Sequence, residues 1–343
     1  MKYIHGGDIY SRKIDHDFSV NLNPLGMPEA VKKALVENAA EFEKYPDINC
    51  LTLKKAVSRH ENISRENIVF GNGASDLIYR TVLFLKPKRA LLIVPTFSEY
   101  EKALKTVDCK TEYYYTDKEN NFETGEDLFQ KLHGKDIVFV CNPNNPTGMF
   151  MRSDILKRVK KICESENIYL FIDECFIDFA EYPEKFKSEL TGDKIIILRA
   201  FTKIYAMAGL RLGYIVSGNE QIVRGIENTG QCWSVSVPSQ IAGTAAIGER
   251  DYLKKTAKLI SQERDYLMCE LRGLGFRVYP SQVNFILFEC GFDLDERLLK
   301  KKILIRSCEN YEGLERGFFR IAVRSHDENV VLINTIREVK ENG

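Results

Sequence analysis

From about residue 68, short apolar runs alternate along the chain with longer amphipathic stretches. The runs have the length of buried strands, and the stretches between them have the length of helices that could cover a sheet. The six runs are Asn67–Phe70, Ala90–Val94, Asp136–Cys141, Ile168–Ile172, Ile195–Leu198 and Tyr214–Val216. The pattern predicts an α/β fold whose mostly parallel sheet is flanked by helices.

The pattern changes after Pro238. A long polar helical stretch covers Ser239–Leu274, and short strands follow near Val283–Phe288 and Phe318–Val323. With 343 residues the chain is too long for one small core. We therefore predict a large domain over residues 31–235 and a smaller α+β domain made of residues 1–30 and 236–343.

The residues that follow the predicted strands carry most of the candidate chemistry. In parallel sheets, ligands bind beyond the carboxyl ends of the strands. These ends read Gly71-Asn72-Gly73-Ala74-Ser75, Pro95-Thr96-Phe97, Asn142-Pro143-Asn144-Asn145-Pro146-Thr147-Gly148, Asp173-Glu174 and Ala200-Phe201-Thr202-Lys203. Glycine, asparagine, a carboxylate and a lysine are thus expected at one edge of the sheet.

Composition narrows the classes of partner. The 49 basic residues equal the 49 acidic ones, so no overall charge favours nucleic acid or an acidic membrane. The apolar runs are far shorter than the roughly 20 residues of a membrane-spanning helix, and the first residues do not resemble a secretory signal. Nine scattered cysteines without a Cys-x-x-Cys pair predict reduced thiols, no metal site and a cytoplasmic protein.

One lysine has an unusual setting. Most lysines are solvated at the surface, but Lys203 directly follows an apolar strand. Arg211 comes eight residues later between Gly209 and Gly213, where glycine allows close approach of the backbone. This spacing favours a chemical role for Lys203.

These residues carry a resemblance to a known family. Thr202-Lys203 with Gly209-Leu210-Arg211-Leu212-Gly213-Tyr214 resembles the lysine motif of fold-type I pyridoxal-phosphate enzymes of the aminotransferase class I/II superfamily. Residues 142–148 and Asp173-Glu174 resemble two further motifs of that superfamily, in the same order. The resemblance implies the fold of the PLP-dependent transferases and pyridoxal 5'-phosphate as the cofactor.

The resemblance also implies a role for each site residue. Lys203 would bind the cofactor covalently, and Asp173 would pair with its ring nitrogen. The remaining cofactor contacts would come from Gly73, Ala74, Ser75, Thr202 and Arg211 at the phosphate, Phe97 stacked on the ring, Asn142 at the ring hydroxyl and Tyr45 at the phosphate in the neighbouring subunit. The last role implies a homodimer. Phe176 stands where many relatives have tyrosine, which would leave Asn142 as the main partner of the ring hydroxyl.

Two branches of the superfamily fit best, histidinol-phosphate aminotransferase and the threonine-phosphate decarboxylase of cobalamin synthesis. The decarboxylase is similar in more places: His5-Gly6-Gly7, residues 17–26, Phe176, Trp233-Ser234-Val235, residues 303–311 and residues 319–325. Asp8 departs from it, since asparagine is usual there.

The resemblance to the decarboxylase implies a small phosphorylated amino acid as substrate. Arg320 would bind its carboxylate, and Arg306 and His5 its phosphate, with Asn23 nearby. Arg324 is as easily a structural salt bridge. Because threonine phosphate has both anionic groups whereas histidinol phosphate has no carboxylate, two cationic anchors favour the former.

We therefore expect PLP-dependent decarboxylation of L-threonine O-3-phosphate to (R)-1-amino-2-propanol O-2-phosphate. Histidinol-phosphate aminotransferase is the alternative, and serine phosphate is not excluded as a substrate, since one methyl group gives only about 1–3 kcal/mol of discrimination. A ligand-sensing module of a transcription regulator is disfavoured, because the sequence shows no basic DNA-binding module.

Overall fold

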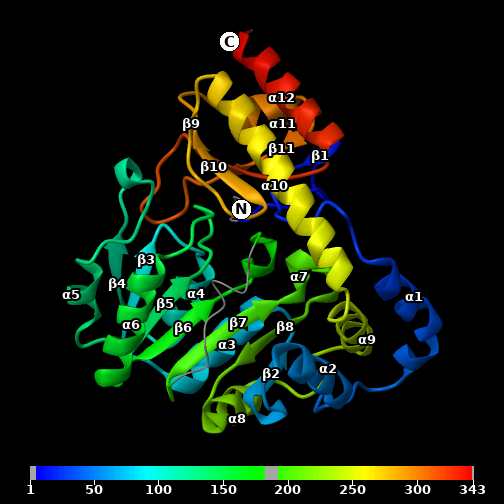
Figure 1. Cartoon of the computed structure of the whole chain (residues 1–343), viewed down its shortest axis with the longest axis vertical. Coiled ribbons are helices and arrows are strands. Elements are labelled where there is room, and N and C mark those ends of the chain that lie inside the picture. Colours follow the sequence, from blue (N-terminus) through cyan, green and yellow to red (C-terminus); the bar gives the residue numbers. More distant parts are fainter. Residues whose placement is uncertain (1–4, 182–191, 342–343) are drawn as a thin grey trace.

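The computed structural model describes residues 5–181 and 192–341. A seven-stranded sheet with the order β2-β8-β7-β6-β5-β3-β4 forms its centre (Figure 1). The strands are β2 (Ile68–Gly71), β3 (Arg89–Val94), β4 (Lys110–Tyr115), β5 (Ile137–Cys141), β6 (Tyr169–Asp173), β7 (Ile195–Ala200) and β8 (Gly213–Val216). Only β8 runs antiparallel to its neighbours, so the predicted mostly parallel sheet is confirmed.

All six predicted strands are present with ends shifted by one or two residues, and β4 was missed. Its sequence, Lys-Thr-Glu-Tyr-Tyr-Tyr, contains no aliphatic residue. β4 is an edge strand whose residues are mostly half-buried or exposed. An apolar run is the signal of a strand buried on both faces, and an edge strand does not need one.

Successive residues of the central strands point to opposite faces of the sheet, and both faces are buried. Leu91, Val138 and Leu170 pack on one face, and their neighbours Leu92, Phe139 and Phe171 pack on the other. The first face is covered by α2 (Leu51–Glu61), α5 (Leu128–Leu132) and α6 (Ser153–Ser165), and the second by α3 (Ala74–Leu85), α4 (Glu99–Lys105) and α8 (Glu220–Thr229). The result is a three-layer α/β arrangement, with the sheet between two layers of helices.

A four-stranded antiparallel sheet lies above the ends of the central strands in Figure 1. It has the order β12-β13-β10-β9, from β9 (Arg277–Val278), β10 (Phe285–Glu289), β12 (Arg306–Ser307) and β13 (Phe318–Ala322). Around it lie α10 (Arg250–Gly273), α11 (Leu294–Lys300) and α12 (His326–Glu341). The N-terminal segment joins this part, because β1 (His16–Asp17) pairs in parallel with β11 (Ile303–Leu304).

The predicted helical stretch over Ser239–Leu274 is two helices. The chain leaves the helical conformation at Ile247–Glu249, between α9 (Val237–Ala246) and α10, where Gly248 disfavours helix continuation. α9 packs against α1 (Glu29–Glu37) and α2. The domain boundaries at residues 30 and 235 stay a prediction.

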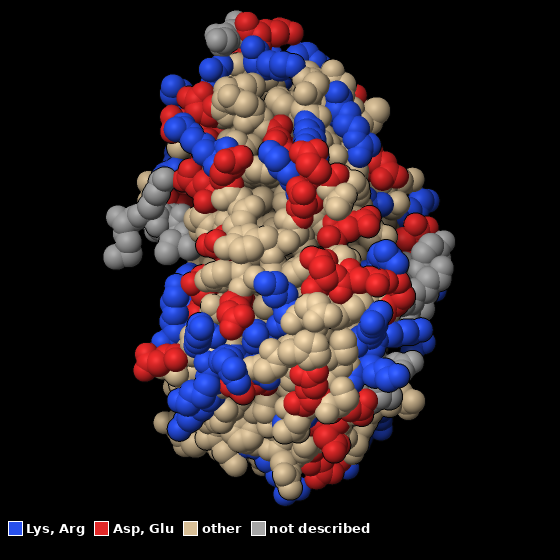
Figure 2. Space-filling view, turned by 90° about the vertical axis from the view of Figure 1, so that its left-hand side faces the viewer, with Lys and Arg blue, Asp and Glu red and all other residues tan. Residues whose placement is uncertain are grey.

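Charges of both signs are interspersed on the face shown in Figure 2. No helix among the described residues is long and apolar enough to cross a membrane. All nine cysteines lie among the described residues as free thiols, five of them buried.

A network of buried ion pairs centres on Arg199 of β7. Arg199 of β7 donates from Nε and Nη2 to Glu174 Oε2 (3.0 and 2.9 Å) and from Nη1 to Glu61, whose second oxygen accepts from the Tyr214 hydroxyl at 2.8 Å. The side chain of Arg199 is 7% exposed and that of Glu174 is fully buried. One arginine therefore neutralises carboxylates from α2 and from the residue after β6.

Replacing Arg199 with methionine is expected to lower the free energy of unfolding by roughly 3–5 kcal/mol, because two carboxylates would remain buried without their cation. Chemical denaturation measures this change. The matched control is Arg224→Met, since Arg224 is 72% exposed and pairs with an exposed Glu220; its effect should stay within about 0.5 kcal/mol. Equal effects of the two substitutions would contradict the expectation.

Candidate active site

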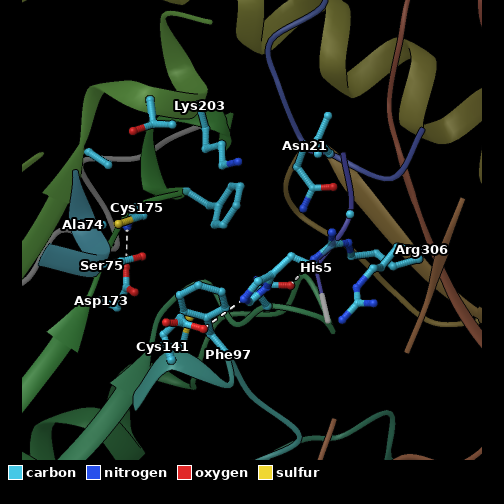
Figure 3. Close-up of a pocket in the computed structure, with 18 of the residues that line it drawn as sticks. His5, Asn21, Ala74, Ser75, Phe97, Cys141, Asp173, Cys175, Lys203 and Arg306 are labelled. Carbon is cyan, nitrogen blue, oxygen red and sulfur yellow. Dashed lines mark hydrogen bonds and ion pairs between the residues drawn. The ribbon is translucent and has the colours of Figure 1, made fainter. Parts of the chain in front are cut away.

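A cavity of about 430 Å³ lies where the carboxyl ends of the central strands face the second sheet. Figure 3 shows Lys203, Asp173, Ala74, Ser75 and Cys175 on one side of it and Asn21, His5 and Arg306 on the other. The full lining is His5, Gly6, Ser19, Val20, Asn21, Ala74, Ser75, Phe97, Glu99, Cys141, Asn145, Asp173, Cys175, Phe176, Ala200, Thr202, Lys203, Arg211, Arg306, Tyr311 and Arg320. The structure thus brings together most of the predicted site residues.

Lys203 lies in α7 (Phe201–Ile204), a single turn that directly follows β7. Burial, together with the charges of Arg320 and Arg211, lowers the pKa of its amine to about 8. The neutral amine is therefore far more abundant near pH 8 than for a solvated lysine. A neutral amine is the form that attacks a carbonyl carbon.

Asp173 ends β6 and is 5% exposed. Its Oδ1 accepts from the Cys175 backbone N–H at 2.9 Å, and its Oδ2 accepts from the Tyr100 hydroxyl at 2.6 Å. Burial raises the pKa of this carboxyl, while both hydrogen bonds oppose the rise. A protonated ring nitrogen in the cavity would be a fitting partner, since a nearby cation favours the ionised carboxylate.

The N-terminus of α3 supplies backbone N–H groups at the same edge. Ala74 and Ser75 begin this helix, where unpaired N–H groups and the helix dipole favour an anion. Gly73 precedes them with φ +86°, and a Cβ there would lie 2.6 Å from Nη2 of Arg211. Gly73 thus allows the guanidinium of Arg211 to lie against the helix N-terminus, while Thr202 lines the cavity beside it. This is a suitable arrangement for a phosphate group.

The opposite wall holds two arginines from adjacent strands. Arg306 of β12 and Arg320 of β13 are directly opposite each other in the antiparallel pair and are 8% and 6% exposed. Arg320 donates to the Ser19 carbonyl at 2.9 Å, to the Tyr311 hydroxyl at 3.3 Å and to Asn145 Oδ1, and its Nε is buried without a partner. Within residues 5–181 and 192–341 it forms no ion pair. A buried guanidinium of this kind is suited to bind a carboxylate.

Asn142, predicted at the ring hydroxyl, does not line the cavity. Its side-chain oxygen accepts from the backbone N–H of Met151 at 2.8 Å, so it stabilises the loop from within. Asn145, three residues further along the same motif, lines the cavity and contacts Arg320. The motif contains three asparagines, and only the path of the loop shows which one faces the site.

Asn23 is likewise placed away from the cavity. Its amide donates to the Ile204 carbonyl at 2.8 Å and to Thr256 Oγ1 at 2.7 Å, so it holds the N-terminal segment against α7 and α10. Asn21, two residues earlier, lines the cavity, and its side-chain oxygen is buried without a partner. The hydrogen bonds of Asn23 to Ile204 and Thr256 turn its side chain away from the cavity, which leaves Asn21 to face the site.

The remaining candidates divide between the cavity and other places. Phe97 and His5 line it, with ring centroids 6.1 Å apart. Tyr45 is 79% exposed and lies outside this cavity. Its ring packs at a tilt against Trp233, with the ring centroids 4.6 Å apart. Arg324 pairs with Glu328 at 2.9 Å and has the structural role that we considered equally plausible. Asp8 caps its own turn by accepting from Ser11 at 2.6 Å.

The sequence interpretation missed several lining residues, namely Asn21, Glu99, Asn145 and Tyr311. Glu99 lies two residues beyond Phe97, and Tyr311 ends a segment that we had already compared with the decarboxylase. Cys141 and Cys175 also line the wall of the cavity. Burial holds the pKa of both thiols well above the ordinary value, so neither is a ready nucleophile.

The site combines the Lys203 amine just after β7, the buried Asp173 carboxylate at the end of the neighbouring β6 and the anion-binding N-terminus of α3. These three features define the site of a pyridoxal-phosphate enzyme. Residues 13–336 match the aminotransferase class I and II family, and the chain belongs to it. Members of this family use pyridoxal 5'-phosphate, and the residues present fit that cofactor.

Particular relatives narrow the comparison. The chain is 36% identical to a threonine-phosphate decarboxylase of Salmonella typhimurium, covering 94% of this chain and 90% of that protein. It is 34% identical to the adenosylcobalamin biosynthesis bifunctional protein CobDQ of Leptospira interrogans, covering 94% of this chain and 38% of that protein. The crystal structure of a histidinol-phosphate aminotransferase from Clostridium acetobutylicum has a TM-score of 0.90 at 30% identity, covering 96% and 100% of the two chains.

The rate at which the cofactor-free protein takes up pyridoxal 5'-phosphate is expected to reach half of its maximum near pH 8, the pKa of Lys203, rather than near the ordinary value of 10.5. Below pH 8 the rate should fall as the amine becomes protonated. Borohydride reduction at each pH, followed by peptide mapping, measures the adduct and its position. Arg320→Ala should move the midpoint upwards, because one cation that lowers the pKa is gone. An adduct on another lysine would refute the assignment.

Proposed function

We propose that this protein is a PLP-dependent decarboxylase of L-threonine O-3-phosphate that forms (R)-1-amino-2-propanol O-2-phosphate for cobalamin synthesis. The observation that carries the proposal is the pair Arg306 and Arg320, which lie side by side on adjacent strands and line the same cavity as Lys203. A substrate with two anionic groups uses two such cations. The similarity to the threonine-phosphate decarboxylase of Salmonella typhimurium, at 36% identity over 94% of this chain, supports the same substrate.

Each residue then has a task that follows from its position. Pyridoxal phosphate, when bound, draws electrons from a bond at the α-carbon of the substrate. The Asp173 carboxylate would pair with the protonated ring nitrogen of the cofactor. Asn145 holds the guanidinium of Arg320. Arg320 binds and orients the substrate carboxylate. Arg306, His5 and Asn21 bind the phosphate, since their polar atoms line the part of the cavity farther from Asp173 (Figure 3).

Lys203 is placed to move a proton. It is buried next to the cavity, and its pKa of about 8 lets the amine gain and lose a proton near neutral pH. When carbon dioxide leaves, the α-carbon needs a proton in its place, and the Lys203 ammonium supplies it. The same residue serves an aminotransferase, so the choice of the bond to be broken lies with the anchors.

The protein is further proposed to act as a homodimer in the cytoplasm. Exposed apolar side chains gather on residues 36–51 and at Trp233: Val36, Phe42, Tyr45, Ile48 and Leu51 are 78, 43, 79, 52 and 58% exposed. Such a patch is typical of a protein interface. A second copy there would receive the Tyr45 hydroxyl at the phosphate end of its cofactor site.

Product analysis tests the reaction. The loaded enzyme is expected to release carbon dioxide from L-threonine O-3-phosphate with retention of pyridoxal phosphate, because the carboxylate is held by Arg320. Serine phosphate serves as the comparison for the methyl group. The alternative is supported by the structural similarity to a histidinol-phosphate aminotransferase. It would replace the proposal if histidinol phosphate with 2-oxoglutarate gave glutamate and threonine phosphate gave no carbon dioxide.

The two arginines should be separable by ligand. Arg320→Ala should weaken binding of L-threonine, which has only the carboxylate, whereas Arg306→Ala should weaken binding of the aminopropanol phosphate, which has only the phosphate. Each loss corresponds to a charged hydrogen bond worth roughly 1.5–3 kcal/mol, or about tenfold to over a hundredfold in affinity. Calorimetric titration of both variants with both ligands measures it. If each variant lost both ligands equally, the division of roles would be wrong.

A further inference from the structure

The cavity wall contains a carboxylate that the proposed chemistry does not use. Glu99, the first residue of α4, lines the same cavity as Arg306 and Arg320, and its side chain is only 13% exposed. An unpaired acid there would repel a doubly anionic substrate. Glu99 has two close hydrogen-bond partners, however: Oε1 lies 2.9 Å from His5 Nε2 and 2.6 Å from Lys102 Nζ.

The contacts define which ring nitrogen of His5 is engaged. The pKa of Glu99 is held at about 2, mainly by the His5 hydrogen bond, so the carboxylate is ionised at neutral pH. A carboxylate can only accept, and Nε2 must therefore carry a hydrogen. Lys102 Nζ lies farther from Nε2, at 3.3 Å, and donates to Glu99 instead. Nδ1 has no hydrogen-bond partner among the described residues.

The position of His5 depends on few other contacts. A Cβ on Gly6 would lie 2.5 Å from the Ser19 carbonyl oxygen, and the Gly7 N–H donates to Ser19 Oγ at 2.8 Å. The two glycines let the chain pack closely on Ser19 and place His5 over the cavity. Residues 5–15 form no helix or strand, and the imidazole is 49% exposed. Its hydrogen bond to Glu99 is therefore the main restraint on the orientation of the ring.

We propose that Glu99 is a positioning residue for His5. It accepts the Nε2 hydrogen and so fixes the ring with Nδ1 free for the ligand, where an Nδ1 hydrogen donates to the substrate phosphate. Lys102 neutralises the charge of Glu99, so that the carboxylate does not repel an anionic ligand. The inference rests on the proposed function in one respect, the assignment of His5 to the phosphate. It adds Glu99 as the residue that positions His5 for its contact with the phosphate.

A double-mutant cycle tests the coupling with inorganic phosphate as the probe. The holoenzyme is used, so that the cofactor already occupies its own phosphate site. Glu99→Gln keeps the shape of the side chain but removes its charge, and it should weaken phosphate binding about tenfold, as the loss of an orienting partner does elsewhere. In the His5→Ala background the same substitution should change binding less than about twofold, because the residue it positions is absent.

The matched control is Glu101→Gln. Glu101 lies on the same helix and pairs with Lys105, which does not line the cavity, so phosphate binding should not change. The cofactor absorbance and melting temperature of Glu99→Gln should equal those of the wild type, which would exclude misfolding. With threonine phosphate, Glu99→Gln should raise KM while kcat stays within about twofold, since no reacting atom is touched.

The outcomes separate the two ideas. Unchanged or tighter phosphate binding in Glu99→Gln, or an equal loss with and without His5, would overturn the role of Glu99. Absence of carbon dioxide from threonine phosphate with the wild type would overturn the proposed function alone, because the phosphate titration does not depend on turnover. A wild-type holoenzyme that binds no phosphate would overturn both.

Discussion

The site depends on an excess of positive charge around one cavity. Lys203, Arg211, Arg306 and Arg320 line one cavity, and the main carboxylate facing them is Asp173, since Glu99 is neutralised by its own partners. Burial of Lys203, together with the nearby charges of Arg320 and Arg211, disfavours its charged form, and the lowered pKa of Lys203 is the direct result. Anionic ligands relieve this repulsion. The same feature therefore makes the lysine reactive and makes the cavity selective for phosphorylated and carboxylated compounds.

Such a site requires a rigid scaffold, and the end of β6 provides it. Asp173 and Glu174 are neighbours, so their side chains point to opposite faces of the sheet. Asp173 faces the cavity and is held by Tyr100, whereas Glu174 is held by Arg199 on the other side. One strand end thus carries the carboxylate that serves the cofactor and the carboxylate that fixes its own backbone. Neither can move without breaking a buried hydrogen bond.

The two sheets have separate tasks. The parallel sheet supplies Lys203, Asp173 and the helix N-terminus, which are the parts that any pyridoxal-phosphate enzyme needs. The second sheet and the N-terminal segment supply Arg306, Arg320, Asn21 and His5, which face the substrate. Relatives with different reactions can thus share the first set, and this explains why an aminotransferase structure superimposes so well on a chain whose substrate anchors indicate a decarboxylase.

The sequence alone predicted the mostly parallel sheet and six of its strands, because a buried strand needs a continuous apolar run. Lys203, Asp173 and Arg211 were predicted as site residues from motifs that resemble those of the family, and the structure places all three at one cavity. The edge strand β4 and the break between α9 and α10 were missed, since their local signals are weak.

Only the tertiary structure showed that Asn145 rather than Asn142, and Asn21 rather than Asn23, lines the cavity. Neighbours in a loop or extended segment share the same composition signal, and long-range packing alone determines which of them faces the cavity. The contact between Glu99 and His5 joins residues 94 positions apart, and no local pattern could reveal it.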